Sequence, residues 1–539
     1  MPHRIFLRPL GLLAGRVRPR TRRLALSAVA GIALTAAASA CTNTSATSAS
    51  SGSAGSAGTL TIAMPPGITG ASSLALPTNC MSPLFSLTYA SLINVQSDGT
   101  YGPGLATSWN YSNKNTVFTL HLRSGVKFAD GTPLTAANVV ATLKYYQKVP
   151  GLNQGYLTPF TSITAPDPTT VVIKYQHPFN GMTTLLANDG ECMNGSIISA
   201  AGLADPAKMG TNMFGAGPYE LDAAATVAGD HYTLVRNPHY YDPSAQHWNK
   251  VIIRVITDAN TALQAVESGQ IQVSTVNDGT LVPSAKAAGV TVSNGLDLGA
   301  GLMILDRNGT LVPALKSQLV RQAIQYAVNR PALAKVLGPQ YHPFDQFVPQ
   351  GVTGYDPSLD NVYPYDPQKA KQLLAQAGYP NGFSLTIGAD GGDPAAANML
   401  QGVAQELTAV GIHTTINTAP AGTIFTQLGE KKVAVVGSSY ALLGDTYFDA
   451  VRLTAEPYAA VWDPFRASDP AVTAEYDKLA VASQSELPSL SQDFNRLITQ
   501  KAWFIPIAAA ASTVYSKGIE IGTSAPIGQF NYIGWKSAS

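Results

Sequence analysis

The sequence predicts an α/β fold in two lobes, and three observations lead to this expectation. Strand-like and helix-like segments alternate in both halves of the 539 residues, as in chains that cover a sheet with helices. Hydrophobic residues make up 45% of the chain, which is enough to form a large core. The length allows two to four domains of roughly 150 residues each, and no short-period repeat is visible.

The first half contains four expected strands and one expected helix. Residues 59–63 are a short apolar strand, and residues 116–123 alternate apolar and polar side chains like a half-buried strand. Thr135 is placed to cap a helix that begins after it. Residues 170–175 and 251–256 are the other two strands.

The second half is richer in expected helices. An apolar stripe begins at Val320, and two further helices begin at Asp366-Pro367 and at Asp393-Pro394. Asp before Pro is typical of a helix start, because Asp caps the helix and Pro fits its first turn. Strands are expected near 383–387 and 433–437, on either side of the third helix.

The charge of the chain is unevenly distributed. Residues 1–40 contain seven arginines and no acidic residue, although the whole chain has a net charge of only +1. The remaining residues have 27 basic and 33 acidic side chains, a net charge of −6. Charged residues are 12% of the chain, and this low share argues against a disordered protein or one that coats nucleic acid.

The N-terminal residues have the pattern of an export signal. A basic region ends at Arg23, and residues 24–40 are apolar or small. Ala38-Ser39-Ala40-Cys41 resembles a bacterial lipobox, in which the cysteine is lipidated, although Leu is usual where Ala38 stands. An ordinary signal-peptidase site at Ala40 is the alternative. We expect residues 1–40 to be a signal peptide and 41–58 to be the lipidated Cys41 with a flexible Ser/Gly/Ala tether.

Signatures of catalysis and of metal binding are missing from the sequence. It has no GxSxG, HExxH, P-loop, EF-hand loop or CxxC motif. We therefore expect no enzyme activity, no cofactor and no metal site. Apart from Cys41 the chain has Cys80 and Cys192, which in an exported protein form either one disulfide or two free thiols; we expect the disulfide.

One long segment resembles a known family. Residues 103–145 are similar to the signature of bacterial extracellular solute-binding proteins of the peptide/nickel ABC importers, the oligopeptide- and dipeptide-binding class. Further segments that resemble the family follow in order at 215–219, 236–241, 258–269 and 365–383, so the resemblance covers about residues 59–539. The residues of the first segment that fit are Leu122, Arg123, Gly125, Val126, Phe128, Asp130, Gly131 and Pro133.

The resemblance implies a domain organisation. It implies a two-lobed, periplasmic-binding-protein type II-like fold with an extra N-terminal subdomain, the three-domain arrangement of the peptide-binding class. Lobe I would contain residues 59–296, with the subdomain at about 89–210, and would be completed by residues 504–539. Lobe II would contain residues 297–503.

The resemblance also implies a function. The protein would be a monomeric lipoprotein on the outer face of the cytoplasmic membrane, would bind a peptide or other small solute between its lobes, and would deliver it to the permease subunits of the importer. A buried peptide ammonium needs a carboxylate partner, and Asp445 is the first candidate. The other candidate ligand contacts are Asp449, Tyr440, Tyr447, Asn79 and Met81.

Both the role of Asp445 and the identity of the ligand have alternatives. Asp445 follows Gly444 and also fits an ordinary loop position. The same fold could bind an oligosaccharide, a nickel chelate or haem instead of a peptide, and an exported enzyme is a further alternative.

Overall fold

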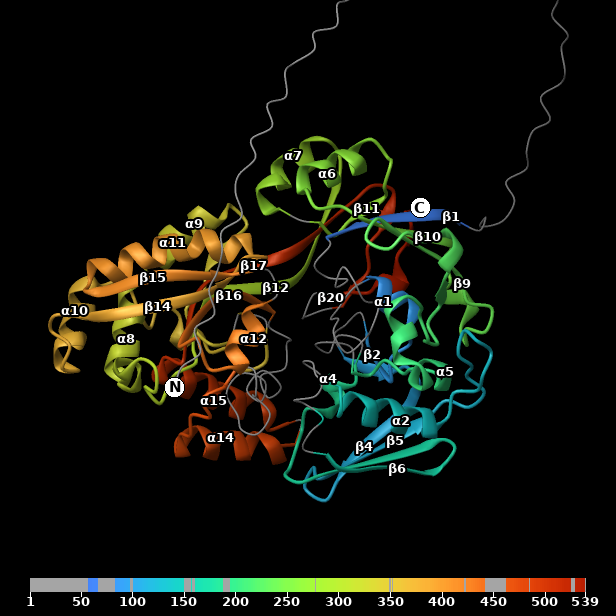
Figure 1. The fold of residues 1–539 in the computed structure, drawn as a ribbon, viewed down its shortest axis with the longest axis horizontal. Helices are drawn as coiled ribbons and strands as arrows, with labels where there is room; N and C mark the ends of the chain where they lie inside the picture. The colour runs from blue at the N-terminus through green and yellow to red at the C-terminus, as the bar shows by residue number, and fades with distance from the viewer. Residues whose placement is uncertain are drawn as a thin grey trace, which may run out of the picture. The chain divides into compact units, whose positions relative to one another are not determined.

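A computed structural model describes residues 57–538 apart from 66–82, 97–99, 150–156, 158–159, 188–193, 277, 349, 351, 421–422, 442–461, 484 and 525–528. One mixed sheet runs through the described residues in the order β15-β14-β16-β12-β17-β11-β1-β10-β9-β8, with β13 paired to β17 beside this path (Figure 1). Its strands are β1 (Ala57–Met64), β8 (Tyr219–Leu221), β9 (His231–Arg236), β10 (Trp248–Val255), β11 (Val273–Ser274), β12 (Thr291–Ile304), β13 (His342–Pro343), β14 (Phe383–Asp390), β15 (Ile412–Ala419), β16 (Val435–Ala441) and β17 (Phe504–Ser516).

The first half of this sheet is built on the parallel strands β1, β10 and β11; β9 continues it antiparallel to β10, and β8 pairs antiparallel with β9. Leu60 and Ile62 of β1 pack in one buried cluster with Val251 and Ile253 of β10. Ala63 belongs to a different cluster, together with residues of helices α6 (Ala259–Glu267) and α7 (Val282–Ala287). The alternation along β1 therefore fills a core on each face of the sheet.

The second half contains the parallel strands β14, β15 and β16 and most of the helices. The Asp-Pro helix starts are confirmed: the Asp366 carboxylate accepts a hydrogen bond from Lys369 N at 2.9 Å, and the Asp393 carboxylate accepts one from Ala396 N at 2.9 Å. The helices are α8 (Gln318–Ala327), α9 (Arg330–Leu337), α10 (Pro367–Gln376), α11 (Pro394–Ala409), α12 (Ile424–Gly429), α14 (Pro470–Val481) and α15 (Leu487–Lys501).

Strands β12 and β17 connect the two halves. They pair antiparallel from Thr291 opposite Ser516 to Met303 opposite Phe504. The N-terminal part of β12 lies in the first half, where β17 also pairs with β11, and its C-terminal part pairs with β16 in the second half. The pairing is irregular between Asn294 and Asp297, so the ladder is interrupted where the two halves meet.

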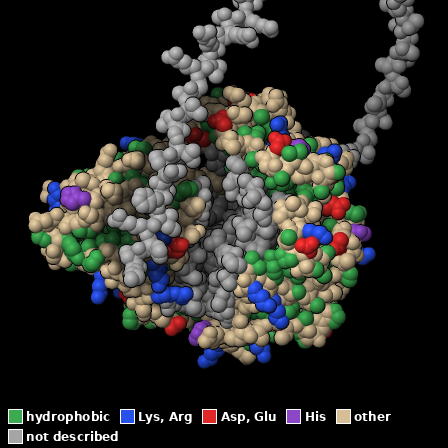
Figure 2. Space-filling view, in the orientation of Figure 1, with side chains coloured by type: hydrophobic (Ala, Val, Ile, Leu, Met, Phe, Trp, Pro, Cys, Tyr) green, Lys and Arg blue, Asp and Glu red, His purple; other side chains and the backbone are tan. Residues whose placement is uncertain are grey.

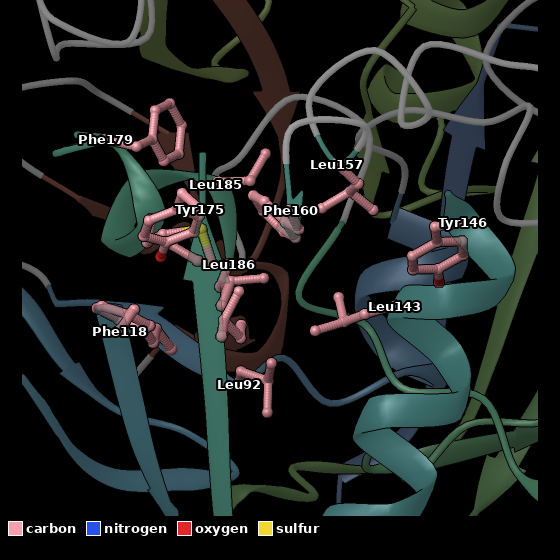
Figure 3. Packing of buried hydrophobic residues seen from close by; sticks show 14 of the residues in the cluster. Leu92, Phe118, Leu143, Tyr146, Leu157, Phe160, Tyr175, Phe179, Leu185 and Leu186 are labelled. Carbon is pink, nitrogen blue, oxygen red and sulfur yellow. The ribbon is translucent and has the colours of Figure 1, made fainter. Parts of the chain in front are cut away.

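A separate four-stranded antiparallel sheet, in the order β4-β5-β7-β6, stands beside the first half. Its core brings together Phe118 of β5, Tyr175 of β7 and Leu143 and Tyr146 of α2, as Figure 3 shows. The strands expected at 116–123 and 170–175 are confirmed here. The elements of this region are α1 (Pro83–Thr88), β2 (Ile93–Val95), β3 (Tyr101–Pro103), β4 (Ala106–Ser112), β5 (Val117–Leu122), α2 (Ala136–Tyr146), β6 (Phe160–Asp167), β7 (Thr170–Tyr175), α4 (Met182–Leu185) and α5 (Ala200–Ala204).

The last described residues return to the first half of the large sheet. Trp535 is fully buried in the same cluster as Leu60, and its carbonyl accepts a hydrogen bond from Trp248 Nε1 at 2.8 Å. Two short antiparallel pairs shape this segment, β18 (Ile519–Glu520) with β21 (Lys536–Ser537) and β19 (Thr523–Ser524) with β20 (Gln529–Phe530).

Candidate functional site

The parallel strands of both halves point their carboxyl ends at the β12–β17 crossing. In the second half, Ala441 at the end of β16 lies opposite Leu298 of β12, and β14 runs parallel to β16. In the first half, Ser274 at the end of β11 lies opposite Tyr515 of β17, and Ala63 of β1 lies beside Ser274. Open α/β sheets bind ligands outside the carboxyl ends of their strands, so this region is the candidate site.

The end of β16 is held in place by a side chain from the turn between β14 and α11. Asp393 Oδ2 accepts a hydrogen bond from Ser439 N at 2.8 Å, and Asp393 Oδ1 lies 3.2 Å from Ser439 Oγ. The same carboxylate caps α11. Asp393 therefore fixes the strand that leads into residues 442–461, where the sequence places three of the six candidate ligand contacts.

The other end of that segment is anchored by a buried cation. Arg307, which follows β12, donates to the carbonyl of Trp462 at 3.2 Å and forms an ion pair with Asp463 at 3.5 Å. Its guanidinium also lies over the Trp503 ring, 4.3 Å from the centroid. Burial lowers the pKa of Arg307, and the neighbouring Asp463 carboxylate opposes that shift. Asn308 Nδ2 adds a hydrogen bond to the carbonyl of Phe465 at 3.0 Å.

The backbone of Tyr440 is the part of the predicted site that the described residues include. Tyr440 is in β16, and its backbone lies opposite Gly299 of β12. The ligand candidates and the three cysteines that lie outside the described residues are Asp445, Asp449, Tyr447, Asn79, Met81, Cys41, Cys80 and Cys192. Their contacts stay predictions.

The signature residues have structural roles away from the strand ends. The Arg123 guanidinium lies 4.8 Å from the centre of the Tyr241 ring. Asn237 Nδ2 donates to the carbonyl of Gly217 at 2.8 Å, and Ala129 N donates to the carbonyl of Gly215 at 3.1 Å. Three separate motifs of the sequence thus pack against one another and fix the frame rather than the site.

Figure 2 shows Lys and Arg side chains (blue) and Asp and Glu side chains (red) scattered over the side that carries β14 and β15 and over the side that carries β9 and α5, without one large patch of either sign among the described residues of this face. Within the described residues, no group of three or more His, Cys, Asp or Glu side chains is arranged to hold a metal ion.

A separate cavity of about 360 Å³ lies in the second half, beside the N-terminus of α9. Its charged groups already have partners: Arg330 donates to the carbonyls of Pro506 and Tyr363, and Asp360 accepts from Gln346 and Tyr355. None of the predicted ligand contacts lines it. Its lining residues are Val328, Asn329, Arg330, Pro331, His342, Pro343, Phe344, Asp345, Gln346, Gln350, Tyr355, Asp360, Asn361, Tyr363 and Tyr365.

Comparison with known families decides the class of the protein. The family model of bacterial extracellular solute-binding proteins, family 5, matches residues 100–453, which is more than half of the chain. The chain belongs to this family. The resemblance that the motifs indicated is thereby confirmed, and the family is one of extracellular solute-binding proteins rather than a class of enzymes.

The curated relatives include glutathione-binding proteins. GsiB of Escherichia coli O1:K1 / APEC is 33% identical over 329 residues, which are 59% of this chain and 61% of that protein. The chain thus spans about three fifths of the length of the curated relatives it matches.

Solved structures share the fold over most of the chain. The PBP AgaA from A. tumefacien R10, solved with agropinic acid, matches with a TM-score of 0.76 and 22% identity over 89% of this chain and 99% of that one. The periplasmic binding protein DppA from Helicobacter pylori, solved with the peptide STSA, matches with a TM-score of 0.73 and 23% identity over 90% and 98%. The predicted type II-like α/β fold is confirmed. In the described part of the family 5 protein, none of the helices is long and apolar enough to cross a membrane.

Proposed function

We propose that this protein captures a peptide or peptide-sized solute between two lobes and delivers it to the permease of an ABC importer. One observation carries the proposal: in a chain of a solute-binding family, the carboxyl ends of two sets of parallel strands meet where β12 and β17 cross. That arrangement offers a solute contacts to both halves at once. Contacts of this kind supply the free energy that closes two lobes around a ligand.

The proposed lobes are residues 59–296 with 504–539 and residues 297–503, with a subdomain at about 89–210. The interrupted pairing between Asn294 and Asp297 supports a hinge at this point, because fewer ladder hydrogen bonds resist bending there. A hinge of two strands permits rotation of one lobe against the other without unfolding either.

The proposed ligand contacts follow from peptide chemistry. An extended peptide offers backbone donors and acceptors that strand ends and loops can pair irrespective of its side chains. Its ammonium requires a carboxylate, for which we propose Asp445, with Asp449 as the second choice. Tyr440 and Tyr447 would line the pocket, and Asn79 and Met81 would approach from lobe I. The described residues on either side of this segment, Ser439 and Asp463, are held by Asp393 and Arg307.

The relatives favour a small peptide and leave one specific alternative. GsiB is named a glutathione-binding protein, and glutathione is a tripeptide. DppA was solved with the peptide STSA, whereas AgaA was solved with agropinic acid. An opine-like solute is therefore the second candidate for the same site.

Export and anchoring complete the proposal. Cleavage before Cys41 and its lipidation would hold the protein on the outer face of the cytoplasmic membrane, with residues 42–58 as the tether. A disulfide between Cys80 and Cys192 is compatible with that oxidising location. We propose no catalytic role and no cofactor.

Calorimetric titration of the solute-free protein tests the proposal. The panel contains glutathione, tripeptides and tetrapeptides, an opine, and an oligosaccharide of similar mass. We expect micromolar or tighter binding of at least one peptide, and opine binding without peptide binding would select the second candidate. Incubation with peptide and ester substrates is the parallel assay: reproducible hydrolysis that a substitution at Asp445 abolishes would contradict a binding-only function.

A further inference from the structure

We propose that Asn115 and Asn180 form a latch that holds the two lobes together at the C-terminus of α14, so that the closed arrangement is populated before a solute binds. Asn115 Nδ2 donates to the carbonyl of Ala480 at 3.1 Å. Asn180 Nδ2 donates to the carbonyl of Ala482 at 3.1 Å and lies 3.4 Å from that of Leu479. Both amides come from the region of the four-stranded sheet, and α14 belongs to the second half of the molecule.

The two amides supply what the end of α14 needs. The last carbonyls of a helix have no partners within the helix, and they carry the negative end of its dipole. Amide N–H groups satisfy such carbonyls without introducing a charge. Here the donors come from a distant part of the chain, with separations of 299 and 302 residues for Asn180 and 365 residues for Asn115. The capping therefore ties one half of the molecule to the other.

The donors are positioned in advance by their own surroundings. Phe179 N donates to the carbonyl of Asn115 at 2.9 Å, which holds the two asparagines together although they are far apart in sequence. The Tyr111 hydroxyl donates to the carbonyl of Asn180 at 3.0 Å and accepts from Thr183 N at 3.1 Å. None of these three bonds involves α14, so the pair keeps its orientation when the lobes separate.

The turn that carries Asn115 has an unusual backbone. Asn113, Lys114 and Asn115 all have left-handed φ angles, of 51°, 54° and 59°. Asn tolerates this region, but a run of three such residues without glycine costs free energy. This turn conformation places the Asn115 amide against α14. We therefore assign the cost of the strained backbone to the latch contact.

Residues near the latch along the chain belong to one buried apolar cluster. Phe118 and Phe179 belong to the same buried cluster as Val472 and Leu479 of α14. Asn180 itself is only 9% exposed. Hydrogen bonds in such a position are costly to leave unmade while the lobes stay together, because a buried donor or acceptor without a partner has also lost its hydration.

The position of the latch allows it to regulate how readily the two lobes open and close. Helix α14 packs on α15, and the carbonyl of Thr499 in α15 accepts a hydrogen bond from Tyr363, so α14 moves with the second half. In Figure 1, α14 and the four-stranded sheet lie at the bottom, whereas β11 and the β12–β17 crossing lie above them. Opening at the crossing would separate the asparagines from α14. The latch proposal rests on the proposed function in one respect only, because it assumes that the two lobes open.

Small-angle X-ray scattering of the purified full chain, freed of solute by unfolding and refolding, tests the latch. Asn180→Asp is nearly isosteric but sets a carboxylate against the helix carbonyls, and Asn115→Gly removes an amide while keeping the left-handed turn. Each is expected to shift the closed-to-open ratio about tenfold toward the open form and so to raise the radius of gyration. Asn113→Gly is the matched control, because Asn113 is an exposed residue of the same turn.

The outcomes separate the latch from the solute. A larger radius of gyration for both latch variants and a wild-type value for Asn113→Gly would support the latch, even if no peptide binds and the proposed function fails. Wild-type values for both latch variants, or equal opening in the control, would overturn it. If Asn180→Asp does not fold cooperatively, the radius of gyration of Asn115→Gly alone tests the latch.

Discussion

Asp393 has two tasks, and together they show how one side chain can affect a distant segment. It caps α11, and it also binds the backbone of Ser439 near the end of β16. Asp366 caps α10 in the same way, with a following proline and a 2.9 Å bond to Lys369 N, and it forms no hydrogen bond with the described residues of β16. The two residues therefore form a natural pair for comparison.

Asp393→Ala is expected to cost about 1–2 kcal/mol of stability through the lost cap and also to weaken solute binding, because residues 442–461 lose one anchor. Asp366→Ala is the control and should lower stability by a similar amount without changing affinity. Urea denaturation and calorimetric titration measure the two effects. Equal affinities for both variants would show that the Asp393–Ser439 bond does not organise the site.

Asp445→Asn tests the proposed ammonium contact. Loss of a charge-assisted hydrogen bond costs roughly 1.5–3 kcal/mol, so peptide affinity should fall at least tenfold. Asp477→Asn, at an exposed position of α14, is the control. Unchanged affinity of the Asp445 variant in calorimetry would remove this residue from the site.

Glu406 predicts a pH dependence of stability. Burial raises the pKa of its carboxyl, and this effect outweighs the hydrogen bond from Asn329 N and the nearby Arg330 charge. The charged form is therefore disfavoured in the folded protein. The neutral form contributes stability at pH values below the ordinary glutamate pKa, and this stability is lost as the pH rises through the raised pKa of Glu406.

Glu406→Gln removes this titration. Urea denaturation at pH 4 and pH 7 measures the free energy of unfolding of both proteins. The value for the variant minus the value for the wild type should be larger at pH 7 than at pH 4. Glu430→Gln, at an exposed surface ion pair with Lys432, is the control. A difference that is constant with pH would contradict the assignment to Glu406.

The crossing strands impose their own constraint at the level of elements. A Cβ atom added at Gly301 of β12 would lie 2.4 Å from the backbone carbonyl oxygen of Ile505 in β17. Backbone cannot move aside as a flexible side chain can. This close approach lies next to a register shift between Ala300 and Gly301, so Gly301 allows the two connecting strands to lie in contact.

Gly301→Ala should therefore destabilise the protein by about 1–3 kcal/mol, the usual cost of forcing atoms into a packed site. Gly429→Ala, at the end of α12, is the control, because a Cβ there has no neighbour within 4 Å. Thermal unfolding of both variants checks the prediction, which fails if the two melting temperatures move equally.

The local elements follow from the sequence to a large extent, whereas their assembly does not. Asp-Pro pairs and apolar periodicity predicted α10, α11 and several strands, because caps and alternation are short-range effects. The Asp393–Ser439, Arg307–Asp463 and Asn180–Ala482 contacts join residues 46 to 302 positions apart and have no local signal. The ligand candidates rest on the family resemblance and on the chemistry of a peptide ligand, and they stay predictions.

At the scale of the whole molecule, the charge distribution agrees with an exported receptor. The seven arginines of residues 1–40 would be removed with the signal, leaving a net charge of −6. A chain of this charge gains nothing from anionic lipid headgroups, so the proposed membrane attachment would depend on the proposed lipid at Cys41.

Cys41→Ser is expected to move the protein from the membrane fraction to the soluble fraction. Fractionation and blotting of cells that express each form measure this shift, with Cys80→Ser as a control that should stay on the membrane. Retention of the Cys41 variant would indicate an uncleaved signal as the anchor.

The central claim is that the two halves enclose a peptide-sized solute. Native mass spectrometry of the gently purified protein tests it most directly, because a captured solute adds its mass to that of the chain. We predict an added mass that disappears on denaturation and fragments as a short peptide. A solute-free mass in every preparation, together with no mass shift after incubation with the peptide panel, would contradict the account.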